Sequence, residues 1–330
     1  HYSIEHNMVT TFESLPCELI MAIIEFIDNP LSIFLDLNSN INRILFDHQI
    51  KLSATIEDHR RIISLPTNLT HLVFMHFKGE NLQRFQNLKS LTLFIDESIV
   101  HKVKLPSSSL IYLKIHFNVD ISTSLFHSLS TLKRLQTLVL TNTQKQSEVI
   151  FPFDSAELSR NIKILQFKNI PAPISSIYHC RELPELKYLQ LQLTEASHPF
   201  HYMSFTFPCL LKHLIIHFQL SFMDLEYVLD GCCEGHLKHL ELYSHSDTAQ
   251  ADYFDTKRWC KLFERFQNLT KCQIELRQKG TRGVYQNTYR QFARQLKSIQ
   301  ELQSKWNMQC WSNCPGYHGY FVYVQIMANL

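Results

Sequence analysis

The hexapeptide "LKYLQL", residues 186–191, has apolar side chains at its first, fourth and sixth positions. Successive side chains of an extended chain point to opposite faces, so Leu189 and Leu191 share one face. Tyr188 and Gln190 then lie on the other face. The hexapeptide therefore predicts a short strand with one buried face.

The same spelling recurs eight more times, and successive copies begin 19 to 32 residues apart. Between the copies lie apolar residues with helical spacing, such as Phe222, Leu225 and Leu229. A strand and its following helix cannot bury their own apolar edges, so successive units are expected to stack. The other eight copies begin at Leu69, Leu88, Leu110, Leu135, Ile162, Leu211, Leu237 and Leu269.

The alternative is an ordinary α/β domain whose leucines imitate a repeat. Two ten-residue stretches argue against it, because "RFQNLKSLTL" from Arg84 and "RFQNLTKCQI" from Arg265 are nearly identical. The series resembles leucine-rich repeats of the longer, helix-backed kind, from Leu69 to Ile274. That family usually carries Asn or Cys at the ninth position, which Asn118 matches here.

The resemblance implies an α/β fold in which an irregular leucine-rich-repeat β-α solenoid covers residues 60–330. We expect an atypical carboxyl-terminal cap over about 245–330, because a solenoid needs its open end shielded. Its expected elements are an amphipathic helix around Trp259–Phe266, a longer helix over 285–306 and a strand from Tyr320.

The amino-terminal segment is unusually apolar, with 20 apolar residues among the 35 of residues 12–46. The breaks "DNP" at 28–30 and "NSN" at 38–40 predict three short helices. A unit of about 40 residues seldom stabilises itself. We therefore expect its apolar surface to meet either the solenoid or a second protein.

This segment resembles an F-box, the three-helix module that docks on the Skp-family adaptor of cullin-based ubiquitin ligases. The resemblance implies an F-box-like helical module over residues 10–50 that binds the adaptor and the ligase core. The alternative is a permanent cap over the first repeat. The matching, adaptor-binding positions are Leu15, Pro16, Glu18, Leu19, Ile20, Ile23, Phe26, Ile27, Leu31, Phe34 and Leu37.

The outward positions of the expected concave sheet are rich in aromatic and imidazole side chains and poor in charge. Such rings bury area at low entropic cost, which suits a protein ligand. The alternative is that they only tile a solvated sheet. The candidate substrate-binding residues are His71, Phe94, Tyr112, His116, Tyr188, His213, His217, His239 and Tyr243.

Composition limits the other classes of function. The 32 Lys and Arg residues nearly balance 30 Asp and Glu residues, so nucleic acid is not an expected partner. With 7 glycines and no phosphate-binding loop or nucleophile motif, we expect neither catalysis nor a cofactor. We expect no metal either, because two Cys/His groups lack a fourth ligand or a shared face. These groups are Cys310, Cys314 and His318, and Cys232, Cys233, His236 and His239.

The nine cysteines are odd in number and include the adjacent pair Cys232–Cys233, which favours a reducing compartment over a disulfide framework. The longest apolar run, Leu19–Ile27, contains Glu25 and is too short to span a membrane. We therefore expect a cytoplasmic or nuclear protein. The predicted function is substrate recognition for an SCF-type ubiquitin ligase; the alternatives are a ligase-independent interaction scaffold and an undetected enzyme.

Overall fold

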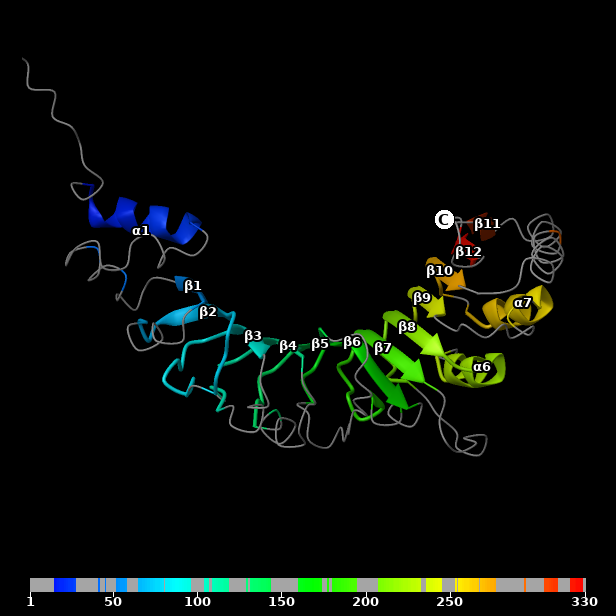
Figure 1. Ribbon diagram of the computed structural model, residues 1–330, viewed down its shortest axis with the longest axis horizontal. Helices are drawn as coiled ribbons and strands as arrows, with labels where there is room; N and C mark the ends of the chain where they lie inside the picture. The colour runs from blue at the N-terminus through cyan, green and yellow to red at the C-terminus, as the bar shows by residue number, and fades with distance from the viewer. Residues whose placement is uncertain are drawn as a thin grey trace, which may run out of the picture.

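The computed structural model describes residues 15–27, 41, 45, 52–57, 65–79, 81–95, 104–106, 109–118, 129, 131–143, 160–173, 177, 180–194, 207–232, 236–244, 253, 255–266, 268–276, 294, 306–313 and 321–328. Ten strands form one parallel sheet in chain order, and the sheet bends into an arc (Figure 1). The strands are β1 (Leu52–Ile56), β2 (Leu69–Phe74), β3 (Ser90–Ile95), β4 (Tyr112–Phe117), β5 (Thr137–Asn142), β6 (Ile164–Pro173), β7 (Tyr188–Thr194), β8 (His213–Gln219), β9 (His239–Ser244) and β10 (Lys271–Leu276).

The remaining elements flank the ends of the sheet. Helix α1 (Cys17–Phe26) lies at the β1 end, and helices α6 (Phe222–Asp230) and α7 (Thr256–Glu264) lie on the outer side of the arc near β8–β10 (Figure 1). Strands β11 (Trp306–Asn313) and β12 (Phe321–Ala328) form an antiparallel pair, and β12 contacts β10. Strand β12 confirms the strand predicted from Tyr320, whereas the helix predicted over 285–306 falls outside the described residues.

The predicted fold class is wrong. The structure is a β-solenoid built mostly from one parallel sheet, with three short helices in its described part, rather than a three-helix module followed by a β-α solenoid. Ahead of β1, α1 is the one named helix in the described part of residues 10–50. The nine repeated hexapeptides do coincide with strands β2–β10.

The apolar residues ahead of the strands explain the error, because they recur every three residues and form turns. The amide of Leu135 donates to the carbonyl of Leu132, and the amide of Leu132 donates to the carbonyl of Leu129. Such i→i+3 bonds place every third side chain on one face, as in a 3₁₀ turn, although Leu129 and Cys180 themselves have helical backbone. The same bonds join Leu82, Phe85 and Leu88, and also Cys180, Leu183 and Leu186.

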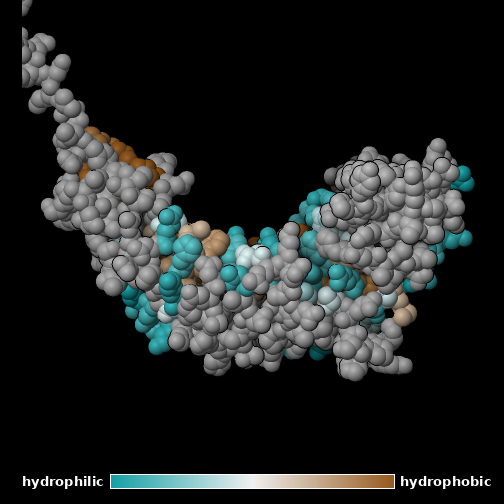
Figure 2. All heavy atoms as spheres, in the orientation of Figure 1, coloured by the Kyte–Doolittle hydropathy of each residue, from teal (hydrophilic) through white to brown (hydrophobic). Residues whose placement is uncertain are grey.

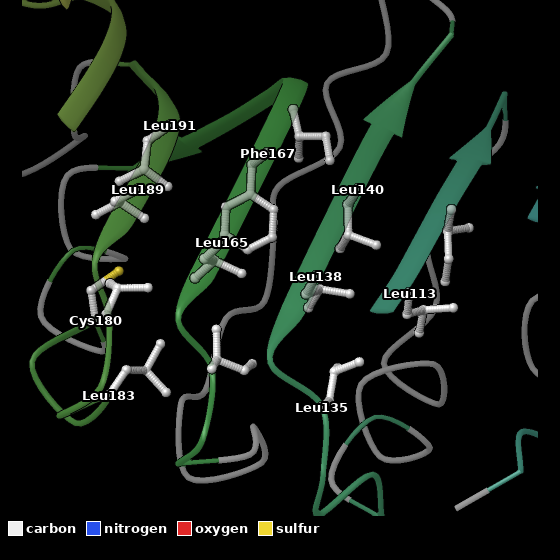
Figure 3. Close-up of a cluster of buried hydrophobic side chains, with 14 of the residues drawn as sticks. Leu113, Leu135, Leu138, Leu140, Leu165, Phe167, Cys180, Leu183, Leu189 and Leu191 are labelled. Atoms are coloured by element: carbon white, nitrogen blue, oxygen red, sulfur yellow. The ribbon is translucent and has the colours of Figure 1, made fainter. Parts of the chain in front are cut away.

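These turns complete one continuous apolar core beneath the sheet. Leu138 and Leu140 of β5 point to the same side as Leu135 of the preceding turn, and all three are fully buried (Figure 3). Each neighbouring coil repeats the arrangement, so the core runs along the whole array. Ile20 and Ile24 of α1 join the same core at the β1 end. Stacking thus buries an edge that no single coil could cover.

Threonine hydroxyls tie neighbouring coils together at the ninth position of the repeat. Thr143 Oγ1 donates to the carbonyl of Phe117 at 3.0 Å, and Thr194 Oγ1 reaches the carbonyl of Ala172 at 3.5 Å. At Asn118 the backbone amide donates to the carbonyl of Ile95. Threonine therefore supplies here the coil-to-coil contact that the resemblance to leucine-rich repeats implied for asparagine.

Candidate functional site

Helix α1 has one face in the core and one face outside it. The amides of Leu19 and Ile20 donate to the carbonyl of Pro16, and Glu18 in the first turn complements the helix dipole. Ile20 and Ile24, one turn apart, are fully buried. On the opposite side, Leu19 is 52% exposed. Figure 2 shows an apolar patch at this end of the molecule.

The other predicted adaptor-binding residues fall into three groups. Leu15, Ile23 and Ile27 are half-buried, while Pro16 and Glu18 are exposed. Ile20 belongs to the core. Leu31, Phe34, Leu37 and the side chain of Phe26 lie outside the described residues. The accessible apolar stripe, defined here as Leu15, Leu19 and Ile23, combines two residues one helical turn apart with Leu15, which precedes the helix.

The nine predicted substrate-binding residues lie on two rows of the concave face. The strand register places His71, Tyr112, Tyr188, His213 and His239 on the first row, at the third position of the repeat. Phe94, His116, His217 and Tyr243 belong to the second row, at the seventh position. A register shift in β6 between Gln166 and Pro171 divides the second row into two halves.

Within each row, rings on neighbouring strands contact one another. The rings of Phe94 and His116 stack with centroids 4.2 Å apart and an interplanar angle of 7°. The His213 ring meets Tyr188 at 5.9 Å and His239 at 4.3 Å, and His217 stacks on Tyr243 at 4.9 Å. His71 and Tyr112 are separated by Ser90 in the register and join none of these groups of rings. The rings form rigid ladders, as aromatic pairs at these distances do.

The β9–β10 end of the concave face carries a satisfied charge network. Glu241 accepts hydrogen bonds from Lys271 Nζ at 3.0 Å and from Tyr243 Oη at 2.9 Å. Burial raises the pKa of Glu241, but the two hydrogen bonds and the charges of Lys271 and His239 together outweigh burial and hold that pKa below its usual value. Burial and the Glu241 contact both raise the pKa of Tyr243. These side chains are therefore ordered before any partner arrives.

Three of the histidines resist protonation. Burial lowers the pKa of His71, with Lys89 adding to the effect. Burial followed by the neighbouring His239 lowers the pKa of His213. Burial also lowers the pKa of His116, with Lys114 and Lys168 adding to the effect. These three imidazoles are therefore neutral at pH 7.

Three residues that were not among the predicted substrate-binding residues fill the gaps between the rings. Gln190 Nε2 lies 3.4 Å from His217 Nε2, and Val139 on β5 is 5% exposed. Thr141 is paired with His116 in the register. All three occupy the fifth or seventh position of the repeat, so counting every outward position regardless of residue type would have found them.

The described thiols and imidazoles do not gather into a metal-binding cluster. Burial raises the pKa of Cys180 to about 12, and burial together with Glu241 raises the pKa of Cys272. No cluster of three or more His, Cys, Asp or Glu side chains in the described ranges could hold a metal ion. Cys232 is buried behind α6, whereas His239 faces the concave side; Cys233, Cys314 and His318 lie outside those ranges.

Neither a protein-family model nor a curated protein matches this chain. In the part of the chain that the structure describes, no helix has the length and apolar composition needed to cross a bilayer.

Proposed function

We propose that this chain is a substrate-binding subunit of an SCF-type, cullin-based ubiquitin ligase. Helix α1 would dock on a Skp-family adaptor, and the concave face of the sheet would bind a protein substrate. The chain itself would perform no bond chemistry. Tethering both proteins raises the effective concentration of substrate lysines near the conjugating enzyme. Such a ligase acts in the cytoplasm or nucleus, which is where we place the protein.

The exposure of Leu19 carries the proposal. A single exposed aliphatic side chain is common on a protein surface, but a contiguous apolar patch marks an interaction site, and Figure 2 shows such a patch at the α1 end of the molecule. Leu19 is 52% exposed, Ile23 extends its stripe by one helical turn, and the half-buried Leu15 lies just ahead of the helix. The stripe coincides with the "LPCEL" segment that resembles an F-box. That resemblance identifies the adaptor as the expected occupant.

Co-purification of the full chain with a Skp-family adaptor tests the docking. The Leu19→Asp variant should lose the adaptor, because it places a charge at the centre of the apolar stripe. Met223→Asp is the matched control, since Met223 is also 52% exposed but lies on α6, at the other end of the array. Adaptor binding by neither wild type nor control, or equal binding by both variants, would contradict the proposal.

The substrate half of the proposal has a separate test. Replacing Tyr112, Tyr188 and His213 together by Ala should abolish substrate capture and leave adaptor binding intact, because all three lie on the first row. Met223 and His236, exposed residues outside both rows, replaced by Ala serve as the control. Unchanged capture by the triple variant would remove the concave face from the function.

A ligase-independent interaction scaffold is the second candidate. The ring ladders of the concave face involve none of the residues of α1, so protein binding there does not require an adaptor. This candidate would be favoured if the chain does not bind the adaptor but binds a protein through the first row.

A further inference from the structure

One part of the concave face has polar groups whose partners are missing. The strand register aligns Phe94, His116, Thr141 and Lys168 on β3, β4, β5 and β6, within the second row. His116 Nε2 and Thr141 Oγ1 are both shielded from water, and neither has a hydrogen-bond partner. Burying a polar group without a partner costs free energy. Two such groups on adjacent strands indicate a site that a ligand completes.

The His116 ring cannot easily turn away to find a partner of its own. It is stacked on Phe94 with centroids 4.2 Å apart and nearly parallel planes. The ring orientation is therefore fixed before binding. A donor held in place in this way loses little conformational entropy when a ligand accepts its hydrogen bond.

The surroundings of these two groups are positively charged. Lys114 lies two residues before His116 on the same face of β4, and Lys168 is exposed beside Thr141. Both lysines act electrostatically on His116. Neither forms an ion pair with a carboxylate among the described side chains, whereas Lys271 at the β10 end pairs with Glu241. Among the described side chains, the β4–β6 part of the face thus carries positive charge without a paired carboxylate.

From this juxtaposition we infer that His116, Thr141, Lys114 and Lys168 form a subsite for an Asp or Glu side chain of the protein that the concave face binds. The two neutral donors match the two oxygens of a carboxylate, and the two ammonium groups supply its counter-charge. Lysine stems are flexible, so they can rotate to admit the carboxylate to the two covered donors. Phe94 and Val139 contact the methylene groups of the bound side chain.

This inference rests on the proposed protein-binding function and adds the chemistry of the partner. Short random peptides displayed on phage are selected against the full chain, and their affinities are measured by fluorescence anisotropy. Selected peptides should contain Asp or Glu. Changing that residue to Asn or Gln should weaken binding to wild type by about tenfold. The same change should have little effect on binding to the K114Q/K168Q variant, which has already lost the counter-charge.

The K257Q/K261Q variant is the matched control, because it removes two lysines from α7, away from the concave face. It should behave as wild type does. An equal loss in wild type and K114Q/K168Q, or selected peptides without acidic residues, would overturn the subsite. Peptides that bind independently of Tyr112, Tyr188 and His213 would instead count against the proposed function itself, and the subsite would fall with it.

Discussion

At the scale of single residues, the repeat that begins at Leu135 contains a satisfied and an unsatisfied threonine hydroxyl only two residues apart. Thr143 donates its hydroxyl hydrogen bond to the carbonyl of Phe117, whereas Thr141, two residues earlier on the same chain, has a shielded hydroxyl without a partner. The free protein therefore retains a local instability at the position where we place a ligand. Functional sites often keep such a cost.

Replacing each threonine by valine, which has nearly the same shape, separates the two roles. Thr141→Val should stabilise the free protein by about 0.5 to 1 kcal/mol, because it removes a buried hydroxyl that has no partner. Thr143→Val should destabilise it by a similar amount, about 0.5 to 1 kcal/mol, because a hydrogen bond between coils is lost. Equilibrium urea unfolding measures both. Destabilisation by Thr141→Val would mean that its hydroxyl is satisfied.

The histidines predict how stability depends on pH. The pKa values of His71, His116 and His213 are lowered by folding, so the unfolded chain binds more protons below about pH 6.5. Stability should then be fully present above that pH and decline as the pH falls toward the folded-state values. The pKa of Glu241 is also lowered, but its contribution is lost only below its ordinary pKa of 4.5.

The urea midpoint should therefore be lower at pH 5.5 than at pH 7.5. A variant with Gln at His71, His116 and His213 should show a smaller difference between the two pH values. A wild-type midpoint that rises on acidification would contradict this assignment.

At the scale of elements, the sequence predicted the strands better than the segments between them. Alternation within each hexapeptide identifies a half-buried strand wherever it occurs, as at Leu189 and Leu191. Apolar residues three apart are compatible with both a helix and an i→i+3 turn, and hydrogen bonding places Leu132 and Leu135 in turns, whereas Leu129 has helical backbone. At α6, where Ser221 caps the first turn, the described part of the chain contains the expected helix.

The arrangement of the concave face was likewise only partly predictable from the sequence. Position counting placed the rings on the correct strands, but it could not show which rings touch. The shift in β6 that divides the second row depends on Asn169, a residue with a positive φ of 56°. Nothing in the hexapeptide spelling indicates that backbone conformation. The missing partners of His116 and Thr141 likewise depend on side-chain placement rather than on pattern.

The turns should matter as much to stability as the strands. Leu135→Ala should cost about 2 to 5 kcal/mol, because Leu135 is fully buried where two coils meet. Ile111→Ala is the control at the second position of a repeat, where the side chain is 36% exposed, and it should cost less than about 1 kcal/mol. Urea midpoints compare the two. A small effect of Leu135→Ala would show that the turns are not part of the core.

At the scale of the whole molecule, each described strand of the ten-stranded sheet pairs with its immediate neighbours in chain order. The stability of such an array is close to a sum of coil and interface contributions, so coils near an end open more readily than coils in the middle. Two buried thiols report on this gradient, because burial raises the pKa of both. Cys180 lies between β6 and β7, and Cys272 lies on β10.

Pulsed alkylation with iodoacetamide at increasing urea should label Cys272 at a lower concentration than Cys180. Mass spectrometry identifies the labelled positions. Cys209, which is exposed, should react throughout and serves as the control for the reagent. Simultaneous labelling of Cys180 and Cys272 would show instead that the ten strands unfold as one cooperative unit.

Because the strands of the sheet follow chain order, the number of strands sets the length of the binding surface. Ten strands at the usual spacing of roughly 4.8 Å give the first row a length of about 43 Å along the arc, which an extended polypeptide of about thirteen residues would match. A point substitution changes the contacts made at one strand and leaves the length of the row unchanged. Only gaining or losing an entire coil would alter the span, in steps of a single strand width.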